Sequence, residues 1–413
     1  MAILDKFLDR GVRKGTLELA RPDGSVARFG QAHDGFPEVR IRILDKTAER
    51  RILTDPRLGA AEAYMDGQLV IEDGDIMQLV QLLRANAPWD KGGEVHEKSR
   101  LKKATGRFAT LLDGINRAAS AKKNIAHHYD IGNDLYRLFL DTEHMQYSCA
   151  YWPQPGMNLE QAQTAKLAHI AAKLALEPGQ RVLDIGCGWG GMAIYLAKNA
   201  GVSVTGITLS EEQLGLARAR AATAGVADKV RFELVDYRDL AKRGDKFDRI
   251  VSVGMFEHVG QAQFRHFFKA SANLLTDEGV MLLHTIGRMG GPGSTDAFTR
   301  KYIFPGGYIP ALSETVAASE KVRLIAADVE NLRLHYAFTL REWYARCVAS
   351  KDAIIAMMDE RFFRMWTFYL AGATAAFESG SMCNYQIQFI RTRRALPLTR
   401  DYMAQAEANL PNR

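Results

Sequence analysis

The stretch that most constrains the fold is residues 181–191, Arg-Val-Leu-Asp-Ile-Gly-Cys-Gly-Trp-Gly-Gly. It starts like a short buried strand, four glycines follow within six positions, and residues 192–199 have helical spacing. A strand that ends in glycines opening a helix lets a ligand approach the backbone, where unpaired N–H groups hold anionic oxygens. The stretch therefore predicts a ligand-binding turn. Because Gly186, Gly188 and Gly191 also satisfy the dinucleotide pattern, the turn alone does not identify the ligand.

Beyond this turn, predicted strands and helices alternate. We expect strands at 203–209, 230–235, 247–253 and 280–286, and helices at 211–224 and 261–275. The alternation predicts an α/β fold, a Rossmann-like, doubly wound parallel sheet that binds its ligand at the carboxyl ends of the strands. Polar residues gather at those predicted ends, among them Thr208, Asp236, Tyr237, Glu257, His258 and His284.

The residue at the end of the second strand favours one class of ligand. A dinucleotide site usually has an acid there, which holds a ribose hydroxyl. In this chain that place, 22 residues after Gly186, is Thr208, and the nearest acids are Glu211 and Glu212. Asp184, immediately before the glycine turn, instead favours a fold that binds S-adenosylmethionine (SAM). A dinucleotide-binding module is therefore the disfavoured alternative.

Length and composition set wider limits. The 413 residues suggest two or three domains, and no run of 18 apolar residues predicts a transmembrane helix. The N-terminus lacks a signal-peptide core, and the four cysteines have neither disulfide-framework nor zinc spacing, which predicts a reducing cytoplasm and no metal site. The net charge of +6 is compatible with anionic lipid or nucleic acid as a partner.

Two segments precede the predicted sheet. Residues 1–90 are expected to form a small α+β domain, with a helix over 1–12, a hairpin over 15–30, a strand over 39–44 and helices near 60–64 and 75–84. Residues 91–123 are rich in Lys and Arg and are predicted to be a basic linker. Such a linker is either attracted to phospholipid headgroups or simply solvated, and the sequence leaves both open.

The second domain, residues 124–413, carries a series of motifs that resemble one family. The chain is similar to the cyclopropane-fatty-acid-phospholipid synthases, which are SAM-dependent methyltransferases. The likeness covers 124 to about 395, and residues 63–67 resemble the N-terminal domain of that family. The motifs that carry it are residues 127–134, 145–152, 181–191, 206–210, 254–260, 283–287, 301–307 and 335–344.

The resemblance implies a reaction and a set of site residues. Methyl transfer from a sulfonium to an alkene makes a carbocation, and closing the cyclopropane ring requires removal of a proton, for which the family holds a bicarbonate ion. The residues that would surround this ion are Cys149, Glu257, His284, Tyr336 and the backbone of Ile286. The residues that would bind SAM are Tyr147, Ser148, Asp184, Gly186, Cys187, Gly188, Thr208, Leu209, Gln213, Asp236 and Tyr237.

Taken singly, these residues have ordinary structural explanations, and the chain departs from the family once. Cys149 is also typical of a small core residue, Glu257 of a helix cap, and His284 and Tyr336 of satisfied core positions. The family often has a cysteine in its C-terminal helix where this chain has Ala373. We expect that thiol to be dispensable if bicarbonate is the base.

The sequence thus predicts an enzyme that methylenates cis double bonds of phospholipid acyl chains, using SAM and bicarbonate. Aromatic and Met residues of helices expected at 338–358 and 360–379 would line the acyl channel. We expect a cytoplasmic protein, peripheral at an anionic inner-membrane surface, with no nucleic-acid partner and compatible with a homodimer. The alternatives are a lipid methyltransferase giving a methyl- or methylene-branched product, and a methyltransferase for a soluble small molecule.

Overall fold

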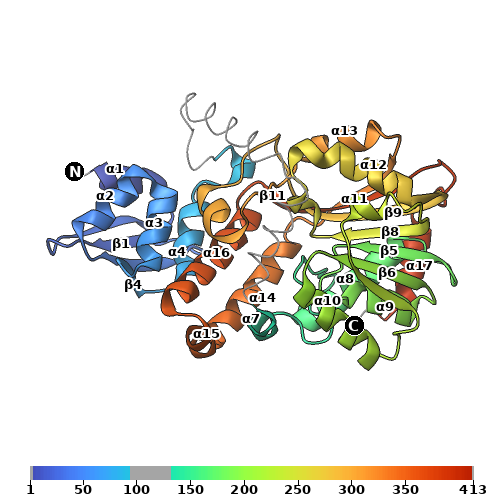
Figure 1. Cartoon of the computed structure of the whole chain (residues 1–413). Coiled ribbons are helices and arrows are strands. Elements are labelled where there is room, and N and C mark those ends of the chain that lie inside the picture. Colours follow the sequence, from blue (N-terminus) through green and yellow to red (C-terminus); the bar gives the residue numbers. More distant parts are fainter. Residues whose placement is uncertain (1–2, 94–131, 412–413) are drawn as a thin grey trace. The chain divides into compact units, whose positions relative to one another are not determined.

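The computed structural model describes residues 3–93 and 132–411 (Figure 1). The chain divides into two compact units, and the described part of the first consists of residues 3–93, 296–305 and 340–381. The second contains residues 132–295, 306–339 and 382–411. The predicted basic linker lies outside the described residues apart from 91–93, as do residues 127–131 of the first motif. Segments 296–305 and 340–381, which we assigned to the second domain, group instead with the N-terminal residues.

The second unit is built on a seven-stranded sheet of order β10-β11-β9-β8-β5-β6-β7. The strands from β7 to β9 run parallel, and β11 and β10 pair antiparallel beyond β9. Their bounds are β5 Arg181–Ile185, β6 Ser203–Thr208, β7 Val230–Leu234, β8 Phe247–Val253, β9 Leu275–Arg288, β10 Ile325–Asn331 and β11 Met382–Ile390. The predicted Rossmann-like fold is confirmed. The prediction of a parallel sheet is corrected by β10 and β11, which we did not expect.

Apolar side chains bury both faces of this sheet. Val182 packs in one core cluster with Val251 and Leu282, whereas the neighbouring residues Leu183 and Ile250 pack in the other. This alternation is the one expected of central strands covered by helices on both sides. The covering elements are α7 Asn133–Phe139, α8 Leu159–Lys173, α9 Gly191–Asn199, α10 Glu211–Thr223, α11 Tyr237–Leu240, η2 Phe256–His258, η3 Gln261–Gln263, α12 Phe264–Leu274, α13 Leu312–Glu320 and α17 Asp401–Ala408.

Local sequence explains where the main helices begin. Asn158 and Gln161 form a reciprocal capping box before α8, and the Ser210 hydroxyl accepts a hydrogen bond from the backbone N–H of Gln213 at the start of α10. Such caps satisfy N–H groups that the first turn of a helix leaves without partners. The start of α10 matters for function because it fixes Gln213 beside the end of β6.

The first unit is an α+β unit with a four-stranded sheet of order β2-β1-β3-β4. Its elements are α1 Ile3–Gly11, β1 Gly15–Ala20, β2 Val26–Gln31, β3 Glu38–Ile43, α2 Lys46–Thr54, α3 Pro56–Met65, β4 Leu69–Asp73, α4 Ile76–Ala85, η1 Trp89–Lys91, η4 Thr299–Ile303, α15 Lys351–Met357 and α16 Glu360–Glu378. Helix α14, His335–Ala349, belongs to it from residue 340 onward. The predicted hairpin, first helix and third strand are present, while α2 and β4 were not anticipated.

The helices expected to line an acyl channel belong largely to this unit. Trp343 and Trp366 are buried, whereas Met357 and Met358 are exposed. The helix predicted over 338–358 is divided into α14 and α15. An acyl channel along these helices stays a prediction. Among the described residues, no helix combines the length and the apolar character that crossing a membrane would need.

Candidate active site

The glycine turn has a backbone that side chains would disturb. Strand β5 ends at Ile185, and Gly186, Gly188 and Gly190 all have positive φ, at 82°, 53° and 81°. The N–H groups of Gly186 and Cys187 both donate to the Ile207 carbonyl, at 2.9 and 3.0 Å. A Cβ added at Gly186 would meet the side chain of Met255 at 2.8 Å. Glycine is therefore required at 186 both by backbone conformation and by space.

A cavity lies where this turn meets the carboxyl ends of the parallel strands. Six of the predicted cofactor residues line it: Gly186, Thr208, Leu209, Gln213, Asp236 and Tyr237. The other lining residues, Met255 and His258 among them, were not predicted to bind the cofactor. The remaining ones are Ile185, Ile207, Val235, Arg238, Val253, Gly254 and Val259. The predicted residues Tyr147, Ser148, Asp184, Cys187 and Gly188 are not among those lining it.

Hydrogen bonds fix the polar side chains of this cavity. Thr208 Oγ1 donates to Gln213 Oε1 at 2.9 Å, which ties the end of β6 to the first turn of α10. Asp236 accepts hydrogen bonds from the guanidinium and the backbone N–H of Arg238, at 2.7–2.8 Å. The Arg238 guanidinium also lies 5.3 Å from the centre of the Tyr237 ring. Arg238 therefore contacts both Asp236 and Tyr237, two of the residues that the family resemblance assigns to SAM.

Asp184 and Lys166, a residue that we did not predict, are two buried ionisable side chains that influence each other's pKa. Lys166, on α8, is fully buried, and its Nζ donates to Ser148 Oγ at 2.9 Å and to Gln146 Oε1. Asp184 is also buried, and its Oδ2 has no hydrogen-bond partner among the described residues. Burial raises the pKa of Asp184 to about 7, although Lys166 opposes the rise, and burial lowers the pKa of Lys166 to about 8. An orphaned acid at this place fits a ligand amine, as SAM would provide.

Glu257 and the backbone of Ile286 are in direct contact. Glu257 Oε1 accepts a hydrogen bond from the Ile286 N–H at 2.6 Å, which joins η2 to the end of β9. Its second oxygen, Oε2, is buried and has no hydrogen-bond partner among the described residues. Burial raises the pKa of Glu257 to about 7, and the bond from Ile286 partly offsets this. This carboxyl group can therefore gain or release a proton near neutral pH.

His284 lies two residues before Ile286 on the same strand. Its side chain is fully buried, and Nε2 has no hydrogen-bond partner in the described part of the chain. Burial, followed by the nearby Lys166 and Lys173, lowers the pKa of His284 well below its ordinary value, so the imidazole is neutral. A buried polar atom without a partner is costly, typically by about 1–3 kcal/mol. His284 Nε2 and Glu257 Oε2 are thus two buried polar atoms that each lack a hydrogen-bond partner among the described residues.

Cys149 and Tyr336 are both buried and belong to neighbouring segments. The N–H of Ala150, next to Cys149, donates to Thr339 Oγ1 at 3.1 Å, and Thr339 lies one turn after Tyr336 on α14. Burial raises the pKa of the Cys149 thiol far above neutrality, so this cysteine is not a thiolate. The structure brings Glu257 to Ile286, and the Cys149 segment to the start of α14. Convergence of all five predicted residues on one ion stays a prediction.

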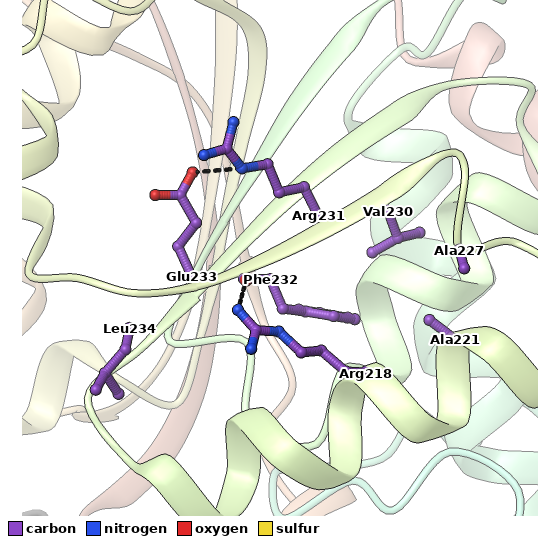
Figure 2. A pocket seen from close by; sticks show the side chains of 8 residues that line it. All are labelled: Arg218, Ala221, Ala227, Val230, Arg231, Phe232, Glu233 and Leu234. Atoms are coloured by element: carbon purple, nitrogen blue, oxygen red, sulfur yellow. Dashed lines mark hydrogen bonds and ion pairs between the residues drawn. The ribbon is translucent and has the colours of Figure 1, made fainter.

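A second, larger hollow shares no lining residue with the first cavity. It follows β7, the edge strand of the sheet, and has a volume of about 530 Å³ against about 90 Å³ for the first cavity (Figure 2). Arg218 donates to the Phe232 carbonyl at 2.9 Å, and Arg231 pairs with Glu233 at 3.0 Å. Arg218 thereby occupies one backbone carbonyl of β7, which is an edge strand of the sheet.

The sheet, the glycine turn and the cavity at the strand ends define the class of S-adenosylmethionine-dependent methyltransferases. Residues 116–387 match the family model described as mycolic acid cyclopropane synthetase. The chain belongs to this family. Residues 3–88 match a separate domain of unknown function.

Relatives and solved structures agree with this assignment. The chain is 41% identical over 366 residues to the cyclopropane-fatty-acyl-phospholipid synthase of Escherichia coli, covering 89% of this chain and 91% of that protein. It is 34% identical to the tuberculostearic acid methyltransferase UfaA1 of Mycobacterium tuberculosis, over 94% and 91% of the two chains. The structure of the mycolic acid cyclopropane synthase CmaA1 with SAH and CTAB superposes with a TM-score of 0.61 at 33% identity, covering 65% of this chain and 97% of that one.

Proposed function

We propose that this enzyme transfers a methylene group from SAM to the cis double bond of an unsaturated acyl chain in a phospholipid, forming a cyclopropane ring, with a bound bicarbonate ion as the proton acceptor. The likeness to the Escherichia coli synthase over most of both chains supports the substrate class. The observation that carries the proposal is the pair of buried, orphaned atoms, Glu257 Oε2 and His284 Nε2.

The proposed SAM site has two parts, which are the buried Asp184 and the cavity at the carboxyl ends of the strands. When bound, SAM supplies an electrophilic methyl group on a sulfonium. We assign its amine to Asp184, whose free carboxylate oxygen is buried behind the glycine turn, and its ribose and adenine to the cavity that Thr208, Gln213 and Tyr237 line. The buried Lys166 donates hydrogen bonds to Ser148 and Gln146 and so holds both side chains in place.

Bicarbonate fits the proposed set of His284, Tyr336 and Glu257 because it is an anion with one O–H. The neutral His284 and the Tyr336 hydroxyl would donate to its oxygens, and Glu257 Oε2 would accept its O–H or share a proton with it. A carboxyl with a pKa of about 7 is suited to such sharing, since it is neither firmly charged nor firmly protonated at neutral pH. A soluble small-molecule substrate would not explain this set of groups.

The test is the lipid composition of cells that express the chain. Mass spectrometry should show unsaturated phospholipids that have gained one CH₂ group, and fragmentation should place a cyclopropane at the former double bond. Purified enzyme should lose turnover when bicarbonate is removed and regain it on addition. A product without a ring, or turnover indifferent to bicarbonate in carefully degassed buffer, would refute the proposal.

The same experiment addresses the runner-up. The likeness to UfaA1 supports a lipid methyltransferase giving a methyl- or methylene-branched chain. A methylene branch has the same mass as a cyclopropane, so only fragmentation or NMR of the isolated lipid separates them, whereas a methyl branch carries two additional hydrogens. Detection of either branch would replace the cyclopropane in the proposal while keeping SAM and the fold.

We further propose that the substrate is met at an anionic bilayer surface on the cytoplasmic side. The basic composition of residues 91–123 supports the membrane contact. Vesicle flotation with anionic and zwitterionic lipids tests it: charge reversal at Lys102 and Lys103 should weaken binding to the anionic vesicles only.

A further inference from the structure

Strand β11 carries a row of three buried amide side chains. The exposed fraction is 1% or less for each of Asn384, Gln386 and Gln388. The residues between them pack in the apolar core on the opposite face of the sheet, namely Cys383, Tyr385, Ile387 and Phe389. Because burying an amide without partners costs about 1–3 kcal/mol, a row of amides on a central strand needs a reason.

The burial of Gln388 has an ordinary structural explanation, whereas Gln386 contacts a predicted site residue, His284. Gln388 Nε2 donates to the Tyr402 hydroxyl at 2.6 Å and to the Lys173 carbonyl, so it ties the strand to its surroundings. Gln386 is the direct cross-strand neighbour of His284. Its Nε2 lies 3.2 Å from His284 Nδ1, and both side chains are fully buried.

We propose that Gln386 is a positioning residue that fixes His284 in the tautomer with its hydrogen on Nε2, and so makes Nε2 a hydrogen-bond donor toward the bound anion. An amide nitrogen can only donate, so Nδ1 facing it must accept. In a neutral imidazole the hydrogen then resides on Nε2, which is the ring nitrogen without a partner among the described residues. The part of this inference that concerns the anion rests on the proposed function.

Rotating the Gln386 amide by half a turn would place the hydrogen of His284 on the other ring nitrogen. If Gln386 presented Oε1 to the ring, Nδ1 would carry the hydrogen and Nε2 would offer a lone pair, which an anion avoids. The choice is one of tautomer and not of charge, because burial keeps the imidazole neutral. Proteins commonly fix the tautomer and orientation of a functional histidine in this way, through a hydrogen bond from a neighbouring residue to its other ring nitrogen.

The first experiment reads the tautomer directly in the wild-type protein. With ¹⁵N-labelled histidine, long-range proton–nitrogen spectra distinguish the protonated from the unprotonated ring nitrogen, and a His284→Gln variant identifies the signal among the ten histidines. We expect His284 to carry its hydrogen on Nε2. A hydrogen on Nδ1 overturns the proposal, and this arm does not depend on any variant of Gln386 folding.

The second experiment removes the amide. Gln386→Met keeps the length of the side chain without a donor, and Gln388→Met is the matched control because it removes a buried amide from the same face of the same strand. We expect the His284 signals to change only in Gln386→Met. In that variant the bicarbonate concentration for half-maximal turnover should rise by about tenfold or more, as loss of a hydrogen bond to a charged group implies, while SAM affinity measured by calorimetry stays as in the wild type.

The outcomes separate this inference from the function on which it rests. Equal changes in the two Met variants would mean that Gln386 is merely structural and would overturn the proposal. A tautomer that changes only in Gln386→Met, in an enzyme whose turnover never depends on bicarbonate, would support the positioning role and refute bicarbonate as the proton acceptor.

Discussion

Replacing Gly186 by alanine tests whether the glycine turn shapes the cofactor cavity. Gly186 has φ of 82°, where an L residue costs about 1–2 kcal/mol. The new Cβ would also lie 2.8 Å from Cβ and Cγ of Met255, and relieving such overpacking typically costs about 1–3 kcal/mol. Together these terms amount to about 2–5 kcal/mol, or roughly thirty- to several-thousand-fold in an equilibrium constant.

Gly244 supplies a matched control in the same unit. Its φ is 83°, and nothing lies within 4 Å of the Cβ that alanine would add. Gly244→Ala therefore carries the backbone strain without the clash. Unfolding by denaturant should show a loss of about 1–2 kcal/mol for Gly244→Ala and about 1–3 kcal/mol more for Gly186→Ala.

SAM affinity measured by calorimetry should distinguish the two variants more clearly than stability does. Met255 must move to admit the new methyl group, and Met255 lines the cavity together with Gly186. We therefore expect SAM binding to weaken at least tenfold in Gly186→Ala and to remain unchanged in Gly244→Ala. Equal SAM affinities in two folded variants would show that this cavity does not hold the cofactor.

Other residues give further tests. Cys149→Ser should retain appreciable turnover, because the buried thiol is neutral and a hydroxyl can still donate; a folded but dead variant would contradict this. Glu257→Ala and Tyr336→Phe should each lower turnover by roughly 10²–10⁴-fold with SAM affinity intact, whereas alanine at the exposed Glu278 should change neither. Burial opposes the charging of His169, but hydrogen bonds to two carboxylates outweigh it and raise its pKa. The stability this gives is present below the ordinary pKa and is lost as pH rises through the raised one, so unfolding midpoints of the wild type and His169→Gln should converge at alkaline pH.

The sequence predicted best what is local. The glycine turn, the capped start of α10 and the strand–helix alternation each depend on residues close together in the chain, and all were located within a few positions. The family resemblance assigned Thr208 and Gln213 to SAM, and the two meet in the structure because a strand end and the next helix start are adjacent in a parallel sheet. Contacts of this kind follow from connectivity alone.

Non-local pairing explains what was missed. Strand β11 joins β9 although about a hundred residues separate Gln386 from His284. Its alternation of amides with apolar residues was visible in the sequence, but the same pattern also fits an exposed strand whose polar side faces water. Lys166 was missed for a similar reason, since a lysine within an apolar helix stretch usually extends its amine to solvent. Only the tertiary structure shows that these polar groups are buried.

The state of the four cysteines bears on which group removes the proton. All four are free and buried; burial raises the pKa of Cys383 to about 11 and that of Cys347 to about 12, and it also raises the pKa values of Cys149 and Cys187 well above the ordinary value of a thiol. Cys383 lies on the face of β11 opposite Gln386, ten residues after Ala373, where the family often has a thiol. A neutral thiol is a poor proton acceptor at neutral pH. Glu257, with a pKa of about 7, titrates where the thiols do not, so we expect proton removal at neutral pH to involve Glu257 rather than a cysteine of this chain.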